Sequence, residues 1–120
     1  MCNEKVLLID GDPTLCEKVA NFLWEQGFKV ESASSAEGWQ ERLDGDDFDI
    51  VILDRKMAGT DGLENLARIK ALAPESRMFL AGSGPATREL LLRDGVAGLV
   101  AGVIEKPYYK ANLLGVLEND

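Results

Sequence analysis

The stretch FDIVILD, residues Phe48 to Asp54, is the strongest strand signal in this chain of 120 residues. Its aliphatic residues follow one another without the polar alternation of a half-exposed strand. A continuous apolar run of this kind is typical of a strand covered on both faces, as in a parallel sheet. The run ends in an acid, so we expect a carboxylate at the point where a buried strand stops.

Runs of the same character occur on both sides of this stretch. KVLLID near the start also ends in an acid, and the later runs MFLA and GVIE are short and mainly apolar. The predicted strands are Lys5 to Asp10, Phe28 to Ser32, Phe48 to Asp54, Met78 to Ala81, and Gly102 to Glu105.

The segments between these strands carry helix signals. Asp12-Pro13 has the form of an N-cap followed by proline at the first helical position, and Gly27 is placed to end that helix. The predicted helices run from Asp12-Pro13 to Gly27, from Ser34 to about Leu43, from Asp61 to near Pro74, from Thr87 to Arg93, and from about Tyr109 to Leu117.

Strands and helices thus alternate five times along the chain. Such alternation predicts an α/β fold with a parallel sheet, right-handed crossovers and helices on both faces. The length suits a five-stranded, doubly wound sheet of the flavodoxin-like kind, with strand order 2-1-3-4-5. Because no repeat or linker divides the chain, we expect residues 1–120 to form one domain.

The composition argues against several classes of function. A net charge of −8 disfavours direct binding to nucleic acid, which needs clustered Lys and Arg. The chain has no histidine, so Ser-His-Asp and Cys-His catalysis and histidine-based zinc sites are excluded. Cys2 and Cys16 match no metal-ligand spacing. Without an apolar run as long as a signal peptide or membrane span, we expect a cytoplasmic protein with no membrane partner.

Four polar residues, Asp10, Asp54, Ser83 and Lys106, lie where apolar runs stop. We expect them to gather at the carboxyl edge of the sheet, where open α/β sheets bind ligands. Asp54 is the candidate carboxylate for attack on phosphorus, and Lys106 is the candidate cation for a phosphoryl oxygen. Asp10 would help to hold a hard divalent cation, most simply Mg²⁺, and Ser83 would donate a hydrogen bond to the phosphoryl group.

Each of these residues also has a plainer interpretation. Acids are common at strand ends, a single lysine is usually a solvated surface group, and Ser83 belongs to the turn sequence GSGP. Asp12 suits helix capping as well as it suits metal binding, and the sequence leaves both roles open.

On these residues the chain resembles the receiver domain of two-component response regulators, over essentially its whole length. The resemblance rests on VLLIDGDP, on IVILDRKMAGTDG and on EKP near the end. It implies Mg²⁺-dependent phosphorylation of Asp54 by a phosphohistidine on a partner. It also implies metal binding by Asp10, Asp54 and the backbone carbonyl of Lys56, with Lys106 contacting the phosphoryl group.

The resemblance also implies partners. The phosphoryl donor would be a sensor histidine kinase or a phosphotransfer protein, and the signal would pass to a downstream protein target or an output domain. Tyr108, Tyr109 and Lys110 lie near the face that receivers commonly use for partners, and a homodimer is one option. The domain would be a phosphoacceptor whose only chemistry is its own phosphorylation and dephosphorylation.

The chain departs from the family pattern at several positions. Gly11 stands in place of the second of two adjacent acids, which predicts weak Mg²⁺ binding. Ala58 replaces a usual proline, Gly82 occupies the position of the switch hydroxyl, and Val103 occupies the position of the switch aromatic residue. These departures predict weak phosphorylation or a different switching motion.

Two other interpretations stay open. A degenerate receiver would serve as a docking or dimerisation module that works without phosphorylation. IDGDPT also matches the D-x-D-x-T opening of haloacid dehalogenase phosphatases, in which Asp10 would be the nucleophile and Asp12 the general acid/base. The short chain, the lack of an acidic pair after Lys106, and the unexplained IVILDRKMAGTDG motif argue against the phosphatase.

Overall fold

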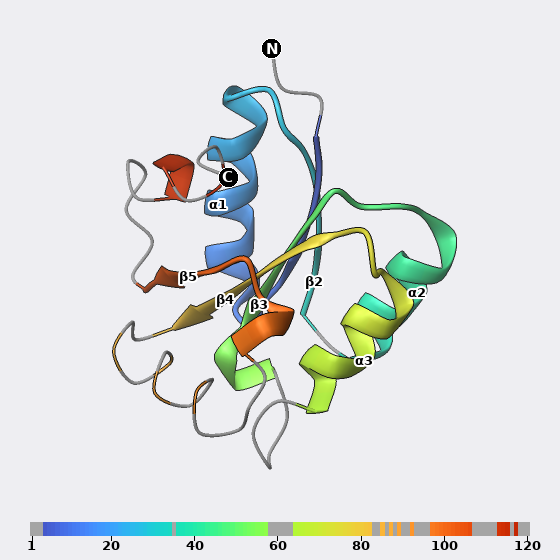
Figure 1. Cartoon of the computed structure of the whole chain (residues 1–120). Helices are drawn as coiled ribbons and strands as arrows, with labels where there is room; N and C mark the ends of the chain where they lie inside the picture. The colour runs from blue at the N-terminus through green and yellow to red at the C-terminus, as the bar shows by residue number, and fades with distance from the viewer. Residues whose placement is uncertain are drawn as a thin grey trace.

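Five parallel strands form one sheet in the computed structural model (Figure 1). They are β1 (Lys5–Ile9), β2 (Lys29–Ala33), β3 (Ile50–Asp54), β4 (Arg77–Gly82) and β5 (Gly102–Glu105). Their order across the sheet is β2-β1-β3-β4-β5. The doubly wound, flavodoxin-like architecture expected from the sequence is thereby confirmed. The structure describes residues 4–34, 36–57, 64–82, 85, 87, 89, 92, 97–106, 113–115 and 117.

Helices fill the intervals between the strands. They are α1 (Pro13–Glu25), α2 (Ala36–Gly45) and α3 (Glu64–Leu72), with short 3₁₀ turns η1 (Arg55–Met57) and η2 (Ala97–Leu99). The described residues between 85 and 92 and between 113 and 117 also have helical backbone. Predicted and observed ends differ by a residue or two for most strands, the usual scatter at element ends. Among the helices described, none has the length and apolar character that crossing a bilayer requires.

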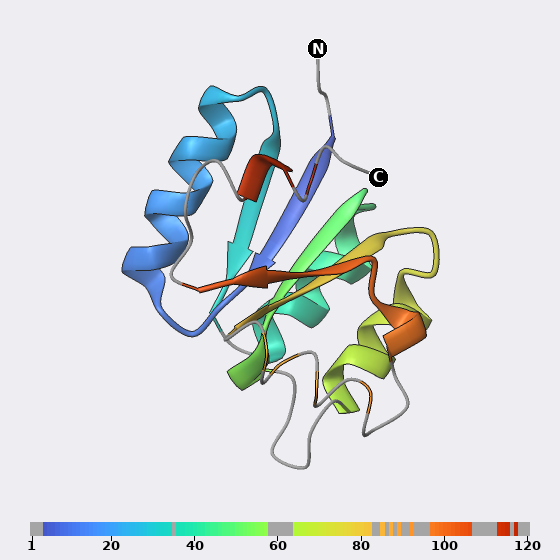
Figure 2. The same cartoon turned by 60° about the vertical axis from the view of Figure 1, so that its left-hand side comes forward.

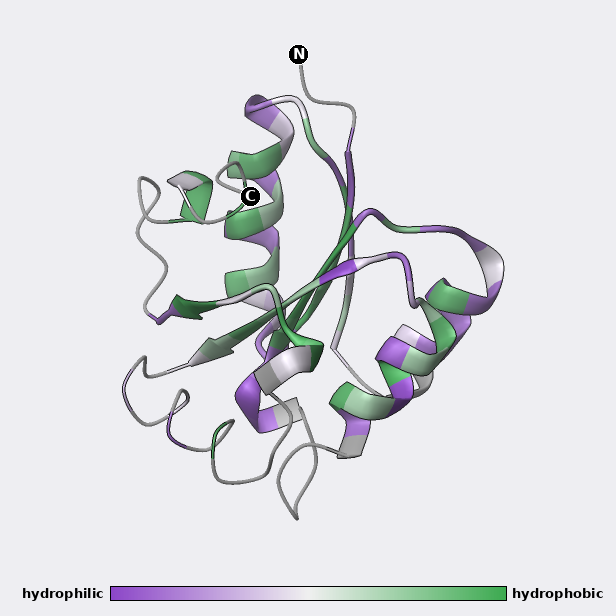
Figure 3. Cartoon of the chain, in the orientation of Figure 1, coloured by the Kyte–Doolittle hydropathy of each residue, from purple (hydrophilic) through white to green (hydrophobic). Residues whose placement is uncertain are grey.

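The helices cover the sheet from two sides (Figure 2). Consecutive residues of β3 point to opposite faces, as in any strand. Val51 and Leu53 join the cluster of buried residues beneath α2 and α3, whereas Ile50 and Ile52 join the cluster that includes α1 residues, Leu113 and Leu117. The apolar character of the strands between the two layers is visible in Figure 3. Burial on both faces is therefore the reason that FDIVILD lacks polar alternation.

Both ends of α1 follow from local sequence. The side chain of Asp12 accepts hydrogen bonds from the backbone N–H groups of Thr14 and Leu15, at 3.1 and 3.2 Å. At the other end Gly27 adopts a φ of 98°, and the N–H of Phe28 donates to the carbonyl of Leu23. This is the αL termination in which glycine avoids the strain of a Cβ. The helix therefore directs the chain from the carboxyl end of β1 to the start of β2.

Strand register decides which residues meet at the carboxyl edge of the sheet. Ile9 pairs with Leu53, so Asp10 and Asp54 lie one position beyond that pair on adjacent strands. On the other side of β3, Asp54 pairs with Ala81. The edge thus brings together chain segments that are far apart in sequence.

Candidate functional site

The centre of the candidate site is a lysine held between two buried carboxylates. The Nζ atom of Lys106 donates to Oδ2 of Asp10 at 2.7 Å and to Oδ1 of Asp54 at 2.9 Å. The side chains of Asp10 and Asp54 are only 4% and 6% exposed, and that of Lys106 is 24% exposed. The structure therefore brings together three of the four residues that the sequence placed at this edge.

Backbone hydrogen bonds hold these residues at the edge. The N–H of Asp10 donates to the carbonyl of Ala33 at the end of β2, at 3.1 Å. The N–H of Lys106 donates to the carbonyl of Gly82 at the end of β4, at 3.0 Å. Asp10 and Lys106 thus each sit directly after a strand, where the main chain still continues the hydrogen bonding of the sheet, and Asp54 is the last residue of β3.

The charges of the two carboxylates dominate the electrostatics of Lys106. Burial favours the neutral amine and lowers its pKa, but hydrogen bonds and charge interactions with Asp10 and Asp54 outweigh that effect. The net result is a raised pKa, so the ammonium stays charged throughout the physiological range. The site consequently holds a permanent positive charge against two acids that are largely removed from water.

The structure gives Asp12 a capping role. One carboxylate oxygen of Asp12 caps α1, while its backbone N–H donates to Oδ1 of Asp10 at 3.0 Å. The intervening residue, Gly11, is exposed and contributes no side chain to the edge. Asp12 therefore supports Asp10 through its main chain, and its side chain is engaged with the helix.

The acids at this edge suit a hard divalent cation in number and type. Within the described residues, no group of three or more His, Cys, Asp or Glu side chains is placed to hold a metal ion. Mg²⁺, however, commonly binds through one or two carboxylates, with water and phosphate oxygens completing its coordination. The carboxylates of Asp10 and Asp54 meet that requirement. The residues present therefore fit Mg²⁺, with fewer protein ligands than a second acid in place of Gly11 would provide.

Several residues singled out in the sequence fall elsewhere. Val103 is 6% exposed and packs into the cluster beneath α2 and α3. Lys56 lies in η1, two residues after Asp54, and is exposed. The remaining ones lie outside the described part of the chain: Ser83, Ala58, Asp61, Tyr108, Tyr109 and Lys110.

Sequence reasoning placed Thr87 in a helix and assigned it no function. In the structure its side chain is fully buried and lies against Gly82, at the end of β4. Nothing in the sequence points to this contact, because it depends on how a helical residue packs onto a strand five positions earlier.

The fold and its carboxyl edge define a flavodoxin-like α/β domain whose strands deliver two acids and a lysine to one site. The family description "response regulator receiver domain" matches residues 6–118. The chain therefore belongs to the response regulator receiver domain family, as its motifs led us to expect.

Curated relatives are longer than this chain. The transcriptional regulatory protein ZraR of Escherichia coli is 35% identical over 119 residues, which are 97% of this chain and 26% of that protein. The transcriptional regulatory protein TcrA of Mycobacterium tuberculosis is 28% identical over 107 residues, which are 87% of this chain and 40% of that protein. The chain thus spans less than half the length of either relative.

Solved structures share the fold. The chemotaxis response regulator CheY4 of Vibrio cholerae matches with a TM-score of 0.81 and 21% identity, covering 98% of both chains. A response regulator of Burkholderia pseudomallei, solved with a phosphorylated aspartic acid, a calcium ion and citrate, matches with a TM-score of 0.79 and 21% identity. That match covers 98% of this chain and 68% of the other.

Proposed function

We propose that this receiver domain accepts a phosphoryl group on Asp54 from a phosphohistidine of a partner protein, and that the modification changes its binding to a downstream partner. The observation that carries the proposal is the pair of contacts from Lys106 to Asp54 and Asp10. Family membership indicates the class of reaction. The geometry indicates candidates for the acceptor, Asp54, for the metal ligand, Asp10, and for the positive charge that contacts the phosphoryl group, Lys106.

The chemistry is a simple displacement at phosphorus. A carboxylate oxygen of Asp54 forms a bond to phosphorus while the phosphorus–nitrogen bond of the donor breaks. The departing imidazole keeps the electron pair of that bond and takes up a proton. Negative charge accumulates as the two anionic groups approach, so the fixed charge of Lys106 stabilises the transition state electrostatically. After transfer the ammonium is placed to contact a phosphoryl oxygen.

Mg²⁺ is the cofactor in this proposal. Asp10, Asp54 and the backbone carbonyl of Lys56 would hold it, and the bound ion would neutralise charge on the phosphoryl oxygens. Because Gly11 supplies no carboxylate, we expect weaker affinity than in a site with a third acid. Ser83 stays a candidate hydrogen-bond donor to the phosphoryl group.

The proposed partners follow from the same reaction. A sensor histidine kinase or phosphotransfer protein would supply the phosphoryl group, in the cytoplasm. A downstream protein target, an output domain or a second copy would respond to it. Two curated relatives are named transcriptional regulatory proteins and are more than twice as long as this chain. An output domain in such a protein would contact nucleic acid, whereas this acidic domain, residues 1–120, would not do so directly.

The first prediction concerns the identity of the phosphorylated residue. Incubation with Mg²⁺ and acetyl phosphate should add one phosphoryl group to the wild-type chain, measured by intact mass. Asp54→Asn should abolish the gain because it removes the nucleophilic oxygen. Asp10→Asn should still be phosphorylated, though more slowly, because it weakens cation binding and leaves the acceptor intact.

The controls separate the competing functions. Peptide mapping after borohydride trapping should locate the modification at Asp54. If Asp10→Asn abolishes the gain while Asp54→Asn retains it, with steady release of phosphate, the haloacid dehalogenase interpretation is correct. If the wild-type chain gains no phosphoryl group under any metal condition, the domain functions as a docking module.

A further inference from the structure

The end of β4 has no side chain to offer to a group bound on Asp54. Asp54 pairs with Ala81, and the next residue of β4 is Gly82, which pairs with Glu105. The carbonyl of Gly82 accepts a hydrogen bond from the backbone of Lys106, so Gly82 lies directly beside the lysine of the site. At this position glycine provides no side chain.

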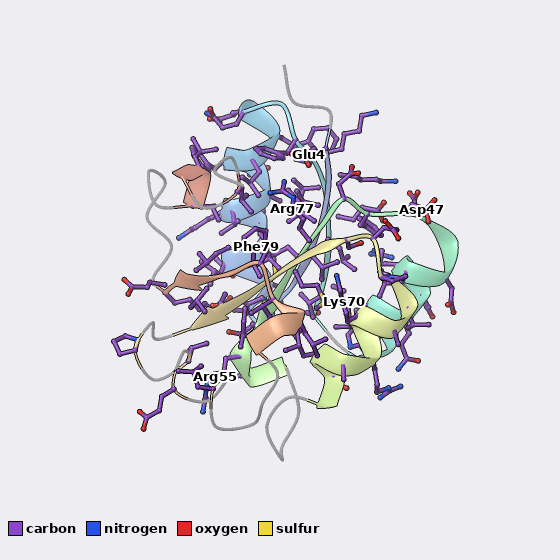
Figure 4. The ribbon with its side chains drawn as sticks, in the orientation of Figure 1. Glu4, Asp47, Arg55, Lys70, Arg77 and Phe79 are labelled. Atoms are coloured by element: carbon purple, nitrogen blue, oxygen red, sulfur yellow. The ribbon has the colours of Figure 1, made fainter. Side chains whose placement is uncertain are left out.

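Another residue occupies the space that a side chain at Gly82 would fill. A Cβ at Gly82 would lie 2.7 Å from Oγ1 of Thr87 and 3.2 Å from Cβ of Arg55. Arg55 is the residue directly after Asp54, and Figure 4 labels it at the lower edge of the sheet. The Thr87 hydroxyl therefore reaches the end of β4 from a helical segment, next to the residue that follows the proposed acceptor.

This hydroxyl is buried without a hydrogen-bond partner. Thr87 is 0% exposed, and its Oγ1 atom has no partner among the described residues. An unpaired buried hydroxyl destabilises a folded protein, and such groups are rare in native structures. A donor held in this way gains a favourable interaction when an acceptor arrives. A phosphoryl group on Asp54 would bring three acceptor oxygens to this edge.

We propose that the Thr87 hydroxyl donates a hydrogen bond to the phosphoryl group carried by Asp54, and thereby couples the helical segment around Thr87 to the phosphorylation state. The inference rests on the proposed function, because it requires a phosphoryl group at Asp54. Lys106, directly after β5, and Thr87, in the helical segment, would both contact this group.

Removing the hydroxyl tests this proposal. Beryllofluoride, a tetrahedral phosphoryl mimic that binds carboxylate oxygens, is titrated into the protein at constant Mg²⁺, and amide NMR shifts are followed. A hydrogen bond to a charged group has a large enough free energy that Thr87→Val should weaken beryllofluoride binding about tenfold. The shifts of the amides in segment 85–92 should also shrink. Thr87→Ser keeps the hydroxyl, so its affinity for beryllofluoride and its amide shifts should match those of the wild type.

Thermal unfolding distinguishes this role from a structural one. If the hydroxyl is unpaired in the free protein, Thr87→Val should melt at the wild-type temperature or a few degrees higher. A hydroxyl needed for folding would instead lower the melting temperature when it is removed.

Moving the hydroxyl provides a second, independent variant. Thr87→Ala removes the nearest atom that a Cβ at residue 82 would meet, so Gly82→Ser then needs only a small shift of the Arg55 side chain, whose Cβ would lie 3.2 Å away. Thr87→Ala alone should bind beryllofluoride weakly, and the double variant Gly82→Ser/Thr87→Ala should recover most of the affinity.

The outcomes separate this inference from the function on which it rests. If Thr87→Val binds beryllofluoride within about twofold of wild type and shows the same amide shifts, the role of Thr87 is disproved and the function of Asp54 is unaffected. If the wild-type chain neither binds beryllofluoride nor gains a phosphoryl group, both proposals are disproved. Asp54→Asn lacks the carboxylate that beryllofluoride would bind, so it serves as the reference and should show no binding at the site.

Discussion

A single ammonium group makes the burial of two carboxylates at the sheet edge possible. Removing an ionised carboxylate from water costs several kcal/mol unless a partner compensates. Lys106 contacts one oxygen of Asp10 and one of Asp54, so the same charge offsets both burial costs. In the proposed reaction the ammonium of Lys106 is therefore already beside Asp54 when the phosphoryl group arrives.

Cys16 provides a residue-scale prediction of pH dependence. Burial, followed by the charges of Asp10 and Asp12, raises the pKa of its thiol from 9.0 to about 11. Below pH 9 the thiol is protonated in both folded and unfolded chains, and its full contribution to stability is present. Between pH 9 and 11 the unfolded chain loses the proton while the folded chain keeps it. The free energy of unfolding should therefore fall by about 2 kcal/mol over this window.

Urea denaturation at a series of pH values measures this effect. Cys16→Ala should lower stability at neutral pH through lost packing, but its stability should decline less between pH 9 and 11. Cys2→Ala removes the other thiol and serves as the control, which should retain the wild-type decline. Parallel curves for Cys16→Ala and wild type would show that the thiol does not titrate as expected.

At the scale of elements, the start of α1 connects fold and site. Asp12 caps the helix with its side chain and supports Asp10 with its backbone N–H, while Pro13 occupies the first helical position. Proline suits this position because its missing N–H would have no partner within the helix. The turn after β1 thus orients a site carboxylate and begins the helix that covers the sheet.

Two substitutions of Asp12 separate capping from metal binding. Asp12→Ala should lower the free energy of unfolding by about 1 kcal/mol because two backbone N–H groups lose their acceptor. Asp12→Asn keeps an oxygen that can cap the helix, so it should lower the free energy of unfolding much less. Calorimetric titration with Mg²⁺ should give the same affinity for Asp12→Asn as for wild type. A clear loss of affinity in Asp12→Asn would instead make Asp12 a metal ligand.

At the scale of the whole molecule, Arg77 connects the two ends of the chain. Its guanidinium donates to Glu4, just before β1, and to the carbonyl of Leu117. Figure 4 shows Arg77 between Glu4 and Phe79, the aromatic ring over which the guanidinium lies at 5.9 Å. These contacts lie on the amino-terminal side of the sheet, away from the phosphorylation site proposed here.

Arg77→Met should therefore lower stability without affecting the site. Losing charged hydrogen bonds at a side chain that is 22% exposed should cost about 1–2 kcal/mol. Equilibrium denaturation measures the cost, and phosphorylation by acetyl phosphate should proceed at the wild-type rate. Lys18→Met, at an exposed position on α1, is the matched control and should change stability by less than about 0.5 kcal/mol. Equal stability of the two variants would contradict the role of Arg77.

The amino-acid sequence was sufficient to predict the sheet and the approximate position of the site. Apolar runs such as Ile50–Leu53 need cover on both faces, and five alternations of strand and helix leave essentially one parallel architecture. In that architecture all strands end at the same edge, so Asp10, Asp54 and Lys106 had to come near one another. Local capping chemistry similarly predicted where α1 begins and ends.

Only the tertiary structure decided how the side chains at that edge interact. It placed one ammonium between two carboxylates, engaged Asp12 in capping, and brought the unpaired hydroxyl of Thr87 into the space beside Gly82. The contacts of Lys106 join segments far apart in the chain, whereas those of Asp12 and Thr87 are local and depend on how a turn and a helical segment pack. Sequence periodicity specifies which face or edge a residue occupies, whereas packing determines which atoms meet there.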